Sequence, residues 1–333
     1  MAEALRARGA AVTFAGSPDR VEARLVPEHG YPFDEFAVAG FPRRPGPAQL
    51  RALALAAAAP IACLRILERR KPDVVLGGGG YVAGPMVLAA RLRGIPAALT
   101  EADAHLGLAN RLAAPFAERV FLALPVHGRD GAKYVAVGRP VPERSRAVAR
   151  AEARERLSLP ADGPVVLVFG GSLGARLLNE LALDSWAESG PAVLHLCGER
   201  DYASLRGRAT RPDYILRPFI DDIGLAYGAA DIALARAGGS VWELAAAGLP
   251  AVLVPGEFAT GGHQRKNAEW FEEAGGAVVV PEAEVQRVPE VVQSLLADSA
   301  KLVAMATAMR AAAKPDAAER IADELLELAA VRR

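Results

Sequence analysis

The stretch Val165-Val-Leu-Val-Phe-Gly-Gly-Ser-Leu-Gly-Ala-Arg176 decides how this chain folds. Its first five residues are apolar, which is typical of a buried strand, and a helical pattern begins where the stretch ends. Between them lie Gly170, Gly171, Ser172 and Gly174. Glycines let the backbone approach an anion, Ser172 adds a hydroxyl donor, and the first N–H groups of a helix carry partial positive charge. The stretch predicts a phosphate cradle, or alternatively a turn whose glycines serve only tight packing.

The same order of strand and helix repeats along the chain. Short apolar runs alternate with alanine-rich helical segments, as in βαβ units. In the first half these runs predict one parallel sheet with strands at Ala11–Ala15, Asp73–Leu76, Ala97–Thr100, Arg119–Leu122 and Tyr134–Val137. In the second half they predict another sheet, with strands at Val165–Phe169, Ala192–Cys197, Tyr214–Leu216, Ile232–Ala235, Ala251–Val254 and Ala277–Val280. The fold class is therefore α/β, with two Rossmann-like, doubly wound parallel-sheet domains that we expect to face a cleft.

Chain length and a proline-containing segment indicate the domain boundaries. A chain of 333 residues exceeds the size at which a single core usually keeps growing. The charged and proline-containing segment 143–163 is predicted to be a linker, which gives a first domain over 1–142 and a second over 164–314. Residues 315–333 are predicted to form a terminal amphipathic helix that can pack back on the first domain.

Composition excludes several classes of protein. The chain has 39 basic and 39 acidic side chains, which argues against a nucleic-acid binder that works by bulk charge. Cys63 and Cys197 lie far apart without metal-ligand spacing, so a reduced setting is expected. The longest apolar run, Ala52–Cys63, is too short to span a bilayer, and the N-terminus lacks a signal-peptide layout. We expect a soluble or membrane-associated protein.

A second glycine-rich turn follows a predicted strand in the first half. The run Gly77-Gly-Gly-Gly-Tyr-Val-Ala-Gly84 precedes a helix that starts near Pro85. Proline suits the first turn of a helix, and the glycines permit conformations closed to other residues. Gly79, Gly80 and Tyr81 are therefore candidates for an anion or sugar site, and a purely structural turn is the alternative.

Acidic and imidazole groups follow the next strand of the first half. Glu101 ends the strand, Asp103 and His105 come directly after it, and Asn110 lies on the following helix. Groups of these types at a strand end are candidates for acid–base work or for binding hydroxyls. Caps of the loop and solvated side chains are the alternative roles.

In the second half, the segment Arg236–Pro250 follows the strand Ile232–Ala235. Gly239 and Ser240 begin a helix and so offer another anion site. Glu243 lies about one turn into that helix, where its carboxylate can accept both hydroxyls of a ribose. An acid favoured by the helix dipole is the alternative.

Two further polar segments follow strands of the second half. After Ala251–Val254 comes a cluster in which His263, Gln264 and Asn267 can hold sugar hydroxyls or phosphate oxygens. After another strand, the backbone at Ile220 can meet the flat edge of a base, and the aspartates that follow it are expected to cap a helix.

Taken together and in order, these motifs resemble the MurG family of peptidoglycan N-acetylglucosaminyltransferases, which have the GT-B fold. The resemblance covers nearly the whole chain and lies in Gly77–Gly84, Gly107–Arg111, Gly170–Arg176, Phe219–Asp222, Arg236–Pro250 and His263–Ala268. It implies transfer of N-acetylglucosamine from UDP-N-acetylglucosamine to lipid I, giving lipid II with inversion at the anomeric carbon. It also implies a peripheral protein on the cytoplasmic face of the cell membrane, with a polyprenyl-diphosphate-linked acceptor.

The resemblance assigns four residue roles. Ser172 would contact the diphosphate, Ile220 the uracil through its backbone, Glu243 the ribose and Gln264 the donor sugar. Gly171, Gly174, Gly239 and Ser240 belong to the same donor-binding motifs. No Asp-X-Asp motif stands at a strand end, so no metal and no cofactor are expected.

The chain also departs from the family pattern. Family members usually begin with a strand and a Gly-Gly-Thr-Gly-Gly-His loop, whereas this sequence opens on what resembles the following helix, so we expect it to be truncated or wrongly started. The family's Glu-Gln-Asn is Glu101-Ala102-Asp103 here, and Gly238–Glu243 is one residue shorter than usual. These differences leave open a related enzyme with another acceptor, or an inactive nucleotide-sugar-binding relic. Glu101, His105 and Asp103 are the candidates for the general base.

The segment Phe41–Lys71 is apolar, with seven basic residues and one acid, Glu68. A basic and apolar face of this kind is suited to an anionic membrane surface. An ordinary core helix with solvated ends is the alternative.

Overall fold

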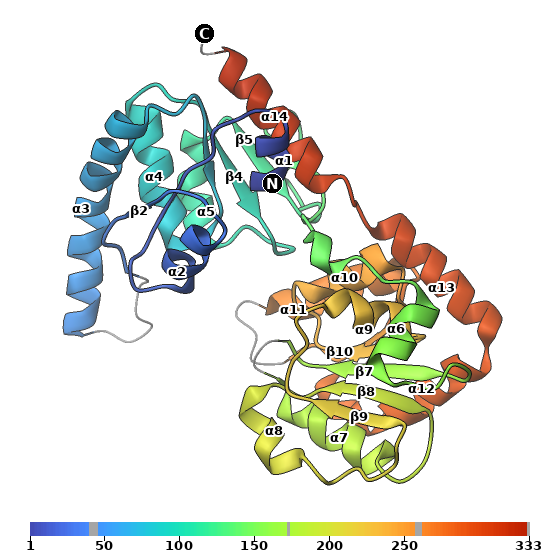
Figure 1. Cartoon of the computed structure of the whole chain (residues 1–333). Coiled ribbons are helices and arrows are strands. Elements are labelled where there is room, and N and C mark those ends of the chain that lie inside the picture. Colours follow the sequence, from blue (N-terminus) through green and yellow to red (C-terminus); the bar gives the residue numbers. More distant parts are fainter. Residues whose placement is uncertain (40–45, 172–173, 257–261, 332–333) are drawn as a thin grey trace. The chain divides into compact units, whose positions relative to one another are not determined.

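A computed structural model describes residues 1–39, 46–171, 174–256 and 262–331 of the chain (Figure 1). Within helices, the side chains at 47, 48, 50–54, 56 and 263 also lie outside the description. The chain divides into two compact units. Unit 1 comprises Met1–Pro140 and Asp316–Arg333, and unit 2 comprises Val141–Pro315.

Unit 1 contains two separate parallel sheets. Its helices are α1 (Ala2–Ala7), α2 (Val21–Glu28), α3 (Pro47–Arg70), α4 (Gly80–Leu92), α5 (Leu108–Ala113), the 3-10 turn η1 (Ala114–Phe116) and α14 (Ala317–Val331). Its strands are β1 (Phe14–Gly16), β2 (Phe33–Glu35), β3 (Val75–Gly77), β4 (Ala97–Glu101), β5 (Arg119–Leu122) and β6 (Tyr134–Ala136). Strand β1 pairs with β2, and the other four form a sheet in the order β3-β4-β5-β6.

The prediction of one sheet in the first half is therefore wrong. The physical reason is pairing: no hydrogen-bonded strand among the described residues joins β1 or β2 to β3. The sequence does not predict the short strand β2, because Phe33-Asp-Glu35 contains a single apolar residue and two acidic ones.

The terminal helix α14 belongs to the core of unit 1. Its Ile321 and Leu325 are buried with Phe121 of β5 and Val137, and it also contacts α1 (Figure 1). An ion pair between Arg8 and Asp323 ties the two ends of the chain together. The first and last segments of the chain thus cover one face of the four-stranded sheet.

Unit 2 contains one six-stranded parallel sheet. Its strands are β7 (Val165–Phe169), β8 (Ala192–Leu196), β9 (Tyr214–Arg217), β10 (Ile232–Ala235), β11 (Ala251–Leu253) and β12 (Ala277–Val279). Its helices are η2 (Glu143–Ser145), α6 (Arg150–Leu157), α7 (Arg176–Trp186), α8 (Glu199–Leu205), α9 (Ile223–Ala229), α10 (Ser240–Ala247), α11 (His263–Glu273), η4 (Glu282–Arg287), α12 (Val288–Ala297) and α13 (Ser299–Ala312).

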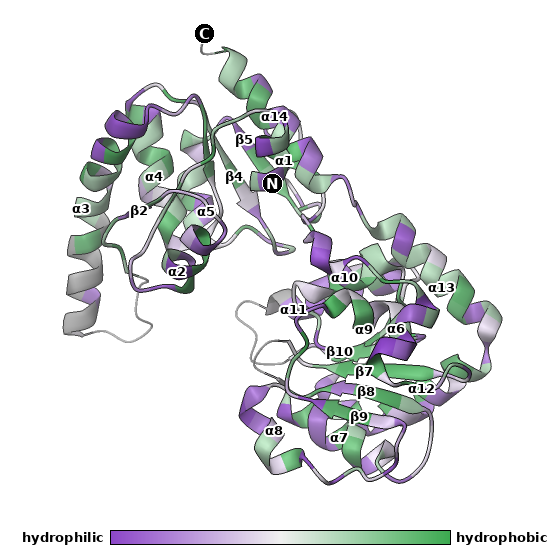
Figure 2. Ribbon diagram, in the orientation of Figure 1, coloured by the Kyte–Doolittle hydropathy of each residue, from purple (hydrophilic) through white to green (hydrophobic). Residues whose placement is uncertain are grey.

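The strands of unit 2 form where the sequence predicts them. Strands β7 and β10 have the predicted bounds, and the other four differ from the prediction by a residue at one end. Every residue of β7, β8 and β10 is buried, and Figure 2 colours β7 as hydrophobic along its length. Continuous apolar runs are the pattern expected for strands covered on both faces by helices.

The segment 143–163, predicted to be a linker, is packed into unit 2. Arg154 of α6 is buried, and its guanidinium donates to the carbonyl oxygens of Pro160, Ala161 and Gly163 and to the Asp231 carboxylate. These bonds satisfy a buried cation and fold the segment against the start of β7. The proline and glycine residues of the segment therefore form an ordered turn.

No single helix among the described residues is long and apolar enough to cross a membrane. One pair of segments, Glu282–Ala297 with Ser299–Val331, passes that test by length and composition only, and the pair is bent by 99°.

Candidate active site

In the sheet of unit 2, the order in which the chain adds strands reverses at β7. The strand order is β12-β11-β10-β7-β8-β9, so the chain first runs outward from β7 through β8 to β9 and then returns to β10 on the other side. In parallel sheets of this kind, ligands bind at the carboxyl ends of the two strands where the order reverses. A ligand-binding site is therefore expected at the loops after β7 and β10.

The loop after β7 is a tight turn built on glycines. Gly171 and Gly174 have φ angles of +89° and +73°, in the left-handed region that favours glycine, and the Gly174 N–H donates to the Gly171 carbonyl at 2.9 Å. A Cβ on Gly174 would lie 2.2 Å from the carbonyl oxygen of Cys197. Ser172 lies outside the described residues, so its contact with a phosphate stays a prediction.

Five α-helices of unit 2 that follow strands begin without a side-chain cap, including α9 after Asp222, and three of the five begin at the predicted donor-binding motifs. Helix α7 begins after Ala175, α10 after Gly239 and α11 after Gly262, and no side chain accepts from their first amides. Uncapped N–H groups and the helix dipole together favour a bound anion. Ser240 is the first residue of α10 and is partly exposed.

Glu243 lies in the first turn of α10, as predicted from its spacing, and is partly buried. Its Oε2 accepts a hydrogen bond of 2.8 Å from the hydroxyl of Tyr227 on α9. Its Oε1 has no hydrogen-bond partner among the described residues. One carboxylate oxygen is thus held by the protein, and the other is available to a ligand.

Two polar residues of α11 hold the neighbouring loops. Gln264 accepts from the backbone N–H of Gly256 at 2.8 Å, and the Asn267 side-chain amide donates to the carbonyl of Ala237 at 3.3 Å. Asn267 is buried, and its Oδ1 has no hydrogen-bond partner. A buried acceptor without a partner is costly unless something binds it, which makes Asn267 a ligand-binding candidate. The side chain of His263 lies outside the description.

The segment after β9 presents its backbone and one aromatic ring. The Ile220 side chain is buried, whereas the ring of Phe219 is exposed. Ile220 can therefore meet a ligand only through its backbone, which is the kind of contact that the sequence predicts for it.

In unit 1, Glu101 ends β4 and is only 8% exposed. Its Oε1 accepts from the backbone N–H of Asp103 at 3.2 Å, and its Oε2 accepts from the N–H of Gly107 and the side-chain amide of Asn110, both at 2.9 Å. Two backbone donors of the following loop and one side chain of α5 thus converge on a single carboxylate. This arrangement favours a role in shaping the loop.

Other groups of the same loop have unused hydrogen-bonding capacity. Asn110 is 3% exposed, and its Oδ1 has no partner, nor has the buried Nδ1 of His105. Asp103 is partly exposed, and its carboxylate has no hydrogen-bond partner among the described residues. Gly79 lies beside the loop, since a Cβ there would be 3.5 Å from the carbonyl of Thr100.

The glycine turn of unit 1 starts a helix much as the turns of unit 2 do. Gly79 and Gly80 have φ angles of +92° and +68°, and α4 begins at Gly80 without a side-chain cap. The hydroxyl of Tyr81 accepts from Nε of Arg20 at 2.9 Å. The structure therefore brings Gly79 and Gly80 together with the loop of residues 101–110, at the carboxyl ends of the adjacent strands β3 and β4.

A buried polar network that sequence reasoning missed lies beneath the β7 loop. His195 of β8 is fully buried, with Nδ1 2.8 Å from the Tyr214 hydroxyl and Nε2 2.9 Å from Oδ1 of Asn179. Burial lowers the pKa of His195 from 6.5 to about 3, so the ring is neutral at physiological pH. Asn179 also donates to the carbonyl of Cys197, the atom that Gly174 approaches. The available signal in the sequence was a polar residue, His195 or Asn179, within an otherwise apolar segment.

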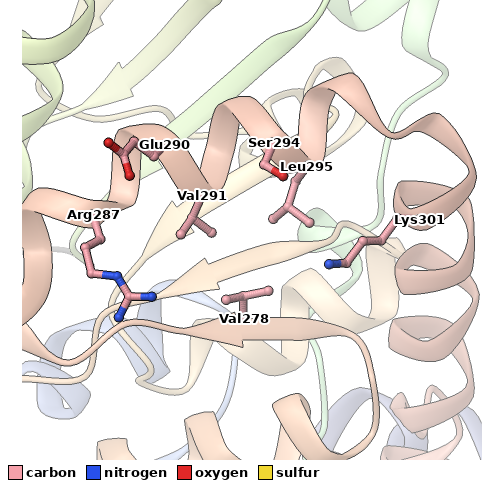
Figure 3. Close-up of a pocket in the computed structure, with 7 residues that line it drawn as sticks. All are labelled: Val278, Arg287, Glu290, Val291, Ser294, Leu295 and Lys301. Carbon is pink, nitrogen blue, oxygen red and sulfur yellow. The ribbon is translucent and has the colours of Figure 1, made fainter.

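Two observations lie outside this arrangement. The pocket in Figure 3, with a volume of about 320 Å³, contains none of the predicted site residues. It is lined by Val278, Arg287, Glu290, Val291, Ser294, Leu295 and Lys301. In the described part of the chain, no group of three or more His, Cys, Asp or Glu residues could hold a metal ion.

Comparison with known proteins identifies the family. The N-terminal domain of glycosyltransferase family 28 matches residues 1–122, and the C-terminal domain of that family matches residues 165–321. The chain belongs to the MurG family within glycosyltransferase family 28. It is therefore a glycosyltransferase with the GT-B fold, as the motifs predicted.

Relatives of the chain support this over nearly its full length. A protein of Halothermothrix orenii is 36% identical over 95% of this chain and 90% of its own length, and one of Nocardioides sp. is 41% identical over 95% and 89%. Both are named UDP-N-acetylglucosamine–N-acetylmuramyl-(pentapeptide) pyrophosphoryl-undecaprenol N-acetylglucosamine transferase. The crystal structure of Acinetobacter baumannii MurG is similar with a TM-score of 0.79 and 30% identity, over 98% of this chain and 94% of that one.

Proposed function

We propose that this chain transfers N-acetylglucosamine from UDP-N-acetylglucosamine to lipid I, the undecaprenyl diphosphate that carries N-acetylmuramoyl-pentapeptide, to give lipid II for peptidoglycan synthesis. One observation carries the proposal. Helices α7 and α10 begin without side-chain caps after β7 and β10, the two strands between which the strand order of unit 2 reverses, and Glu243 lies in the first turn of α10. The names of relatives that are 36% and 41% identical support this choice of donor and acceptor.

Unit 2 binds the donor nucleotide in this proposal. The diphosphate lies on the amides of Gly171 and the start of α7, with Ser172 adding a hydroxyl, while Gly174 shapes the turn through its own bond to the Gly171 carbonyl. The α10 start at Gly239 and Ser240 adds a second positive helix end. Glu243 accepts from the ribose hydroxyls, and the backbone at Ile220 meets the uracil.

The donor sugar is bound by residues of α11. Gln264 holds the loop after β11 at Gly256, and Asn267 offers a buried acceptor oxygen without a partner. His263 begins the same helix. An N-acetyl sugar supplies both hydroxyl and amide donors, which match such an acceptor.

The reaction needs no metal in this proposal. A hydroxyl of the acceptor sugar attacks the anomeric carbon on the face opposite the leaving group, which inverts that centre. The bond to UDP breaks, and the negative charge that develops on the diphosphate is stabilised by backbone amides and helix dipoles. The hydroxyl proton passes to a general base.

Asp103 is our choice for that base. It is partly exposed without a described partner, whereas the Glu101 oxygens are already used by three donors. Asp103→Asn is expected to lower kcat by about 10²–10⁴-fold, the range for loss of a general base, with little change in the donor KM. His105→Gln is the comparison variant, and an equal loss of kcat in that variant alone would assign the base to His105.

A transfer assay tests the proposed activity directly. The purified chain is given UDP-N-acetylglucosamine and a lipid I analogue with a shortened polyprenyl chain, with and without a strong chelator. Formation of the disaccharide product at an unchanged rate in chelator supports the proposal. Donor binding by calorimetry without transfer to this acceptor would contradict it and would favour a different acceptor, the second possibility that Asp103 in place of the family's asparagine raises.

We also place the protein at the cytoplasmic surface of the cell membrane. Helix α3 and its neighbour α4 carry exposed apolar side chains, with Ile61 57% and Leu92 65% exposed. Arg65 on α3 is exposed without a described partner, whereas Arg69 and Arg70 pair with Asp34. The first part of the basic segment, including residues 41–45 and the side chains at 50–54, lies outside the description.

Vesicle flotation tests the membrane assignment. The chain is expected to float with vesicles that contain anionic phospholipid and to stay at the bottom with neutral ones, because the cation at position 65 adds to apolar contact. The double variant Ile61→Asp, Leu92→Asp should abolish flotation. Flotation of that variant at the level of the unchanged chain would remove this surface from the proposal.

A further inference from the structure

We infer that Tyr227 is a positioning residue of the donor site: its hydroxyl fixes the Glu243 carboxylate in the orientation that recognises the ribose hydroxyls of a nucleoside diphosphate. The inference rests on the proposed function, because it deepens the ribose role given to Glu243. Tyr227 lies on α9, sixteen residues before Glu243, and forms the hydrogen bond of 2.8 Å that holds Oε2.

The helix that carries Tyr227 is fixed by close backbone contacts. A Cβ on Gly224 would lie 2.1 Å from the carbonyl oxygen of Arg146, and one on Gly228 would lie 2.0 Å from that of Val148. The N–H of Val148 also donates to the carbonyl of Gly224 at 3.1 Å. Only glycine at both positions lets α9 approach the segment 146–148 this closely, so α9 has little freedom to shift.

The ring of Tyr227 is fixed as well. It is 3% exposed and packs against Phe169, with ring centroids 6.2 Å apart and planes inclined by 56°. Phe169 is the last residue of β7, directly before the glycine turn that we assign to the diphosphate. The phenol is therefore held in register with the strand that carries that turn.

The direction of the hydrogen bond is also determined. Burial raises the pKa of Tyr227 far above its ordinary value of 10, and the nearby Glu243 charge and hydrogen bond raise it further. The phenol therefore stays protonated and donates, and the carboxylate accepts. A hydrogen bond to an ionised acceptor is stronger than one between neutral groups.

Holding one carboxylate oxygen prepares the other. A glutamate in the first turn of a helix has several rotamers, and a ligand that binds it must otherwise select one of them at an entropic cost. The bond from Tyr227 to Oε2 restricts the Glu243 side chain to one rotamer, so the position of Oε1 at the start of α10 is also fixed. Two neighbouring ribose hydroxyls can use such a fixed acceptor, and a nucleotide without them gains nothing from it.

Calorimetric titration with UDP and with 2′,3′-dideoxy-UDP tests the inference on the full chain. Tyr227→Phe keeps the ring and removes only the hydroxyl. We expect this variant to bind UDP about tenfold more weakly, the loss that corresponds to one charge-assisted hydrogen bond, and to bind the dideoxy nucleotide within about twofold of the unchanged chain. An unchanged preference for UDP over the dideoxy nucleotide in Tyr227→Phe would overturn the inference.

Two further variants separate positioning from general destabilisation. Tyr214→Phe removes another buried hydroxyl of unit 2, the one bonded to His195, and should leave the UDP preference unchanged. In the Glu243→Ala background, Tyr227→Phe should have no further effect on UDP affinity, because the group it positions is gone. An equal effect of Tyr227→Phe with and without Glu243 would contradict the inference.

The same titrations separate this inference from the proposed function. If the unchanged chain itself binds UDP and the dideoxy nucleotide equally, the ribose role of Glu243 fails, and the inference fails with it. If the unchanged chain prefers UDP and Tyr227→Phe keeps that preference, only the positioning role of Tyr227 fails.

Discussion

Glu101 is the last residue of β4 in unit 1, and Glu243 lies in the first turn of α10 in unit 2, after Gly238 and Gly239. The two carboxylates have different hydrogen-bond partners. Glu101 accepts three hydrogen bonds from its own loop and its neighbouring helix. Glu243 accepts one, from Tyr227 on another helix, and keeps an oxygen without a described partner. A carboxylate saturated by protein donors shapes the backbone around it, whereas one held at a single oxygen is prepared for a ligand.

The largest effect is expected in the donor-side loop, which is the loop between β7 and α7 that carries Gly171 and Gly174. Gly174→Ala forces a side chain into the left-handed region and places its Cβ 2.2 Å from the Cys197 carbonyl oxygen, which is rigid backbone. Strain in φ costs about 1–2 kcal/mol, and overpacking costs about 1–3 kcal/mol. We expect unit 2 to lose about 3–5 kcal/mol of unfolding free energy. Urea unfolding followed by tryptophan fluorescence measures this, because all three tryptophans, Trp186, Trp242 and Trp270, lie in unit 2.

Gly171→Ala is the matched control for that prediction. Gly171 also has a positive φ, but a Cβ there would meet nothing within 4 Å. Only the conformational cost applies, about 1–2 kcal/mol. Equal losses in the two variants would show that contact with the end of β8 does not hold the loop.

The two glutamates should separate stability from binding. Glu101→Ala leaves the Gly107 N–H without its acceptor, at about 1–3 kcal/mol, and leaves the Asn110 amide with only its second acceptor, the Thr100 carbonyl. Hydrogen exchange read by mass spectrometry should therefore rise in residues 101–110, and UDP affinity should stay unchanged. Glu243→Ala should weaken UDP binding by about 10–100-fold through loss of charge-assisted bonds to the ribose.

A crossed result would break the comparison. If Glu101→Ala weakened UDP binding as much as Glu243→Ala, the first carboxylate would be part of the donor site. If Glu243→Ala left UDP affinity unchanged, its free oxygen would have no ligand role.

The strands that position both sites could be predicted from the sequence. Continuous apolar runs such as Val165–Phe169 and Ile232–Ala235 are local signals, and the glycines that follow them mark where each strand ends. The split of the first half into two sheets was not predictable in this way. It depends on which strands pair, and a run such as Phe33–Glu35 says nothing about its neighbour.

The sequence indicates candidate site residues by type and place, but it does not indicate their hydrogen-bond partners. Tyr227 meets Glu243 because α9 packs beside α10, and His195 meets Asn179 because α7 covers β8. Such pairs are set by tertiary packing, since the partners lie 16 residues apart in the chain and on different elements. A buried polar residue in an apolar segment signals that some partner exists, without naming it.

The effect that is smallest at neutral pH concerns the network beneath the donor-side loop, because it appears only as the pH falls below the ordinary pKa of histidine. The folded-state pKa of His195 is lowered to about 3 by burial, whereas in the unfolded chain it is near 6.5. Below pH 6.5 the unfolded state therefore binds a proton that the folded state does not, so stability falls as pH is lowered. One such group contributes at most about 1.4 kcal/mol per pH unit, over the window from pH 6.5 toward 3.

His195→Gln tests this contribution in urea titrations between pH 7 and pH 4.5, again followed by tryptophan fluorescence. Glutamine can still accept from Tyr214 and donate to Asn179, but it does not titrate. The variant should be less stable at pH 7, because its fit is imperfect, and its stability should fall less steeply with acid. The unchanged chain, titrated in parallel, gives the reference slope. If His195→Gln kept that slope, His195 would gain a proton in the folded protein, and the donor-side loop would rest on a less rigid support than its burial indicates.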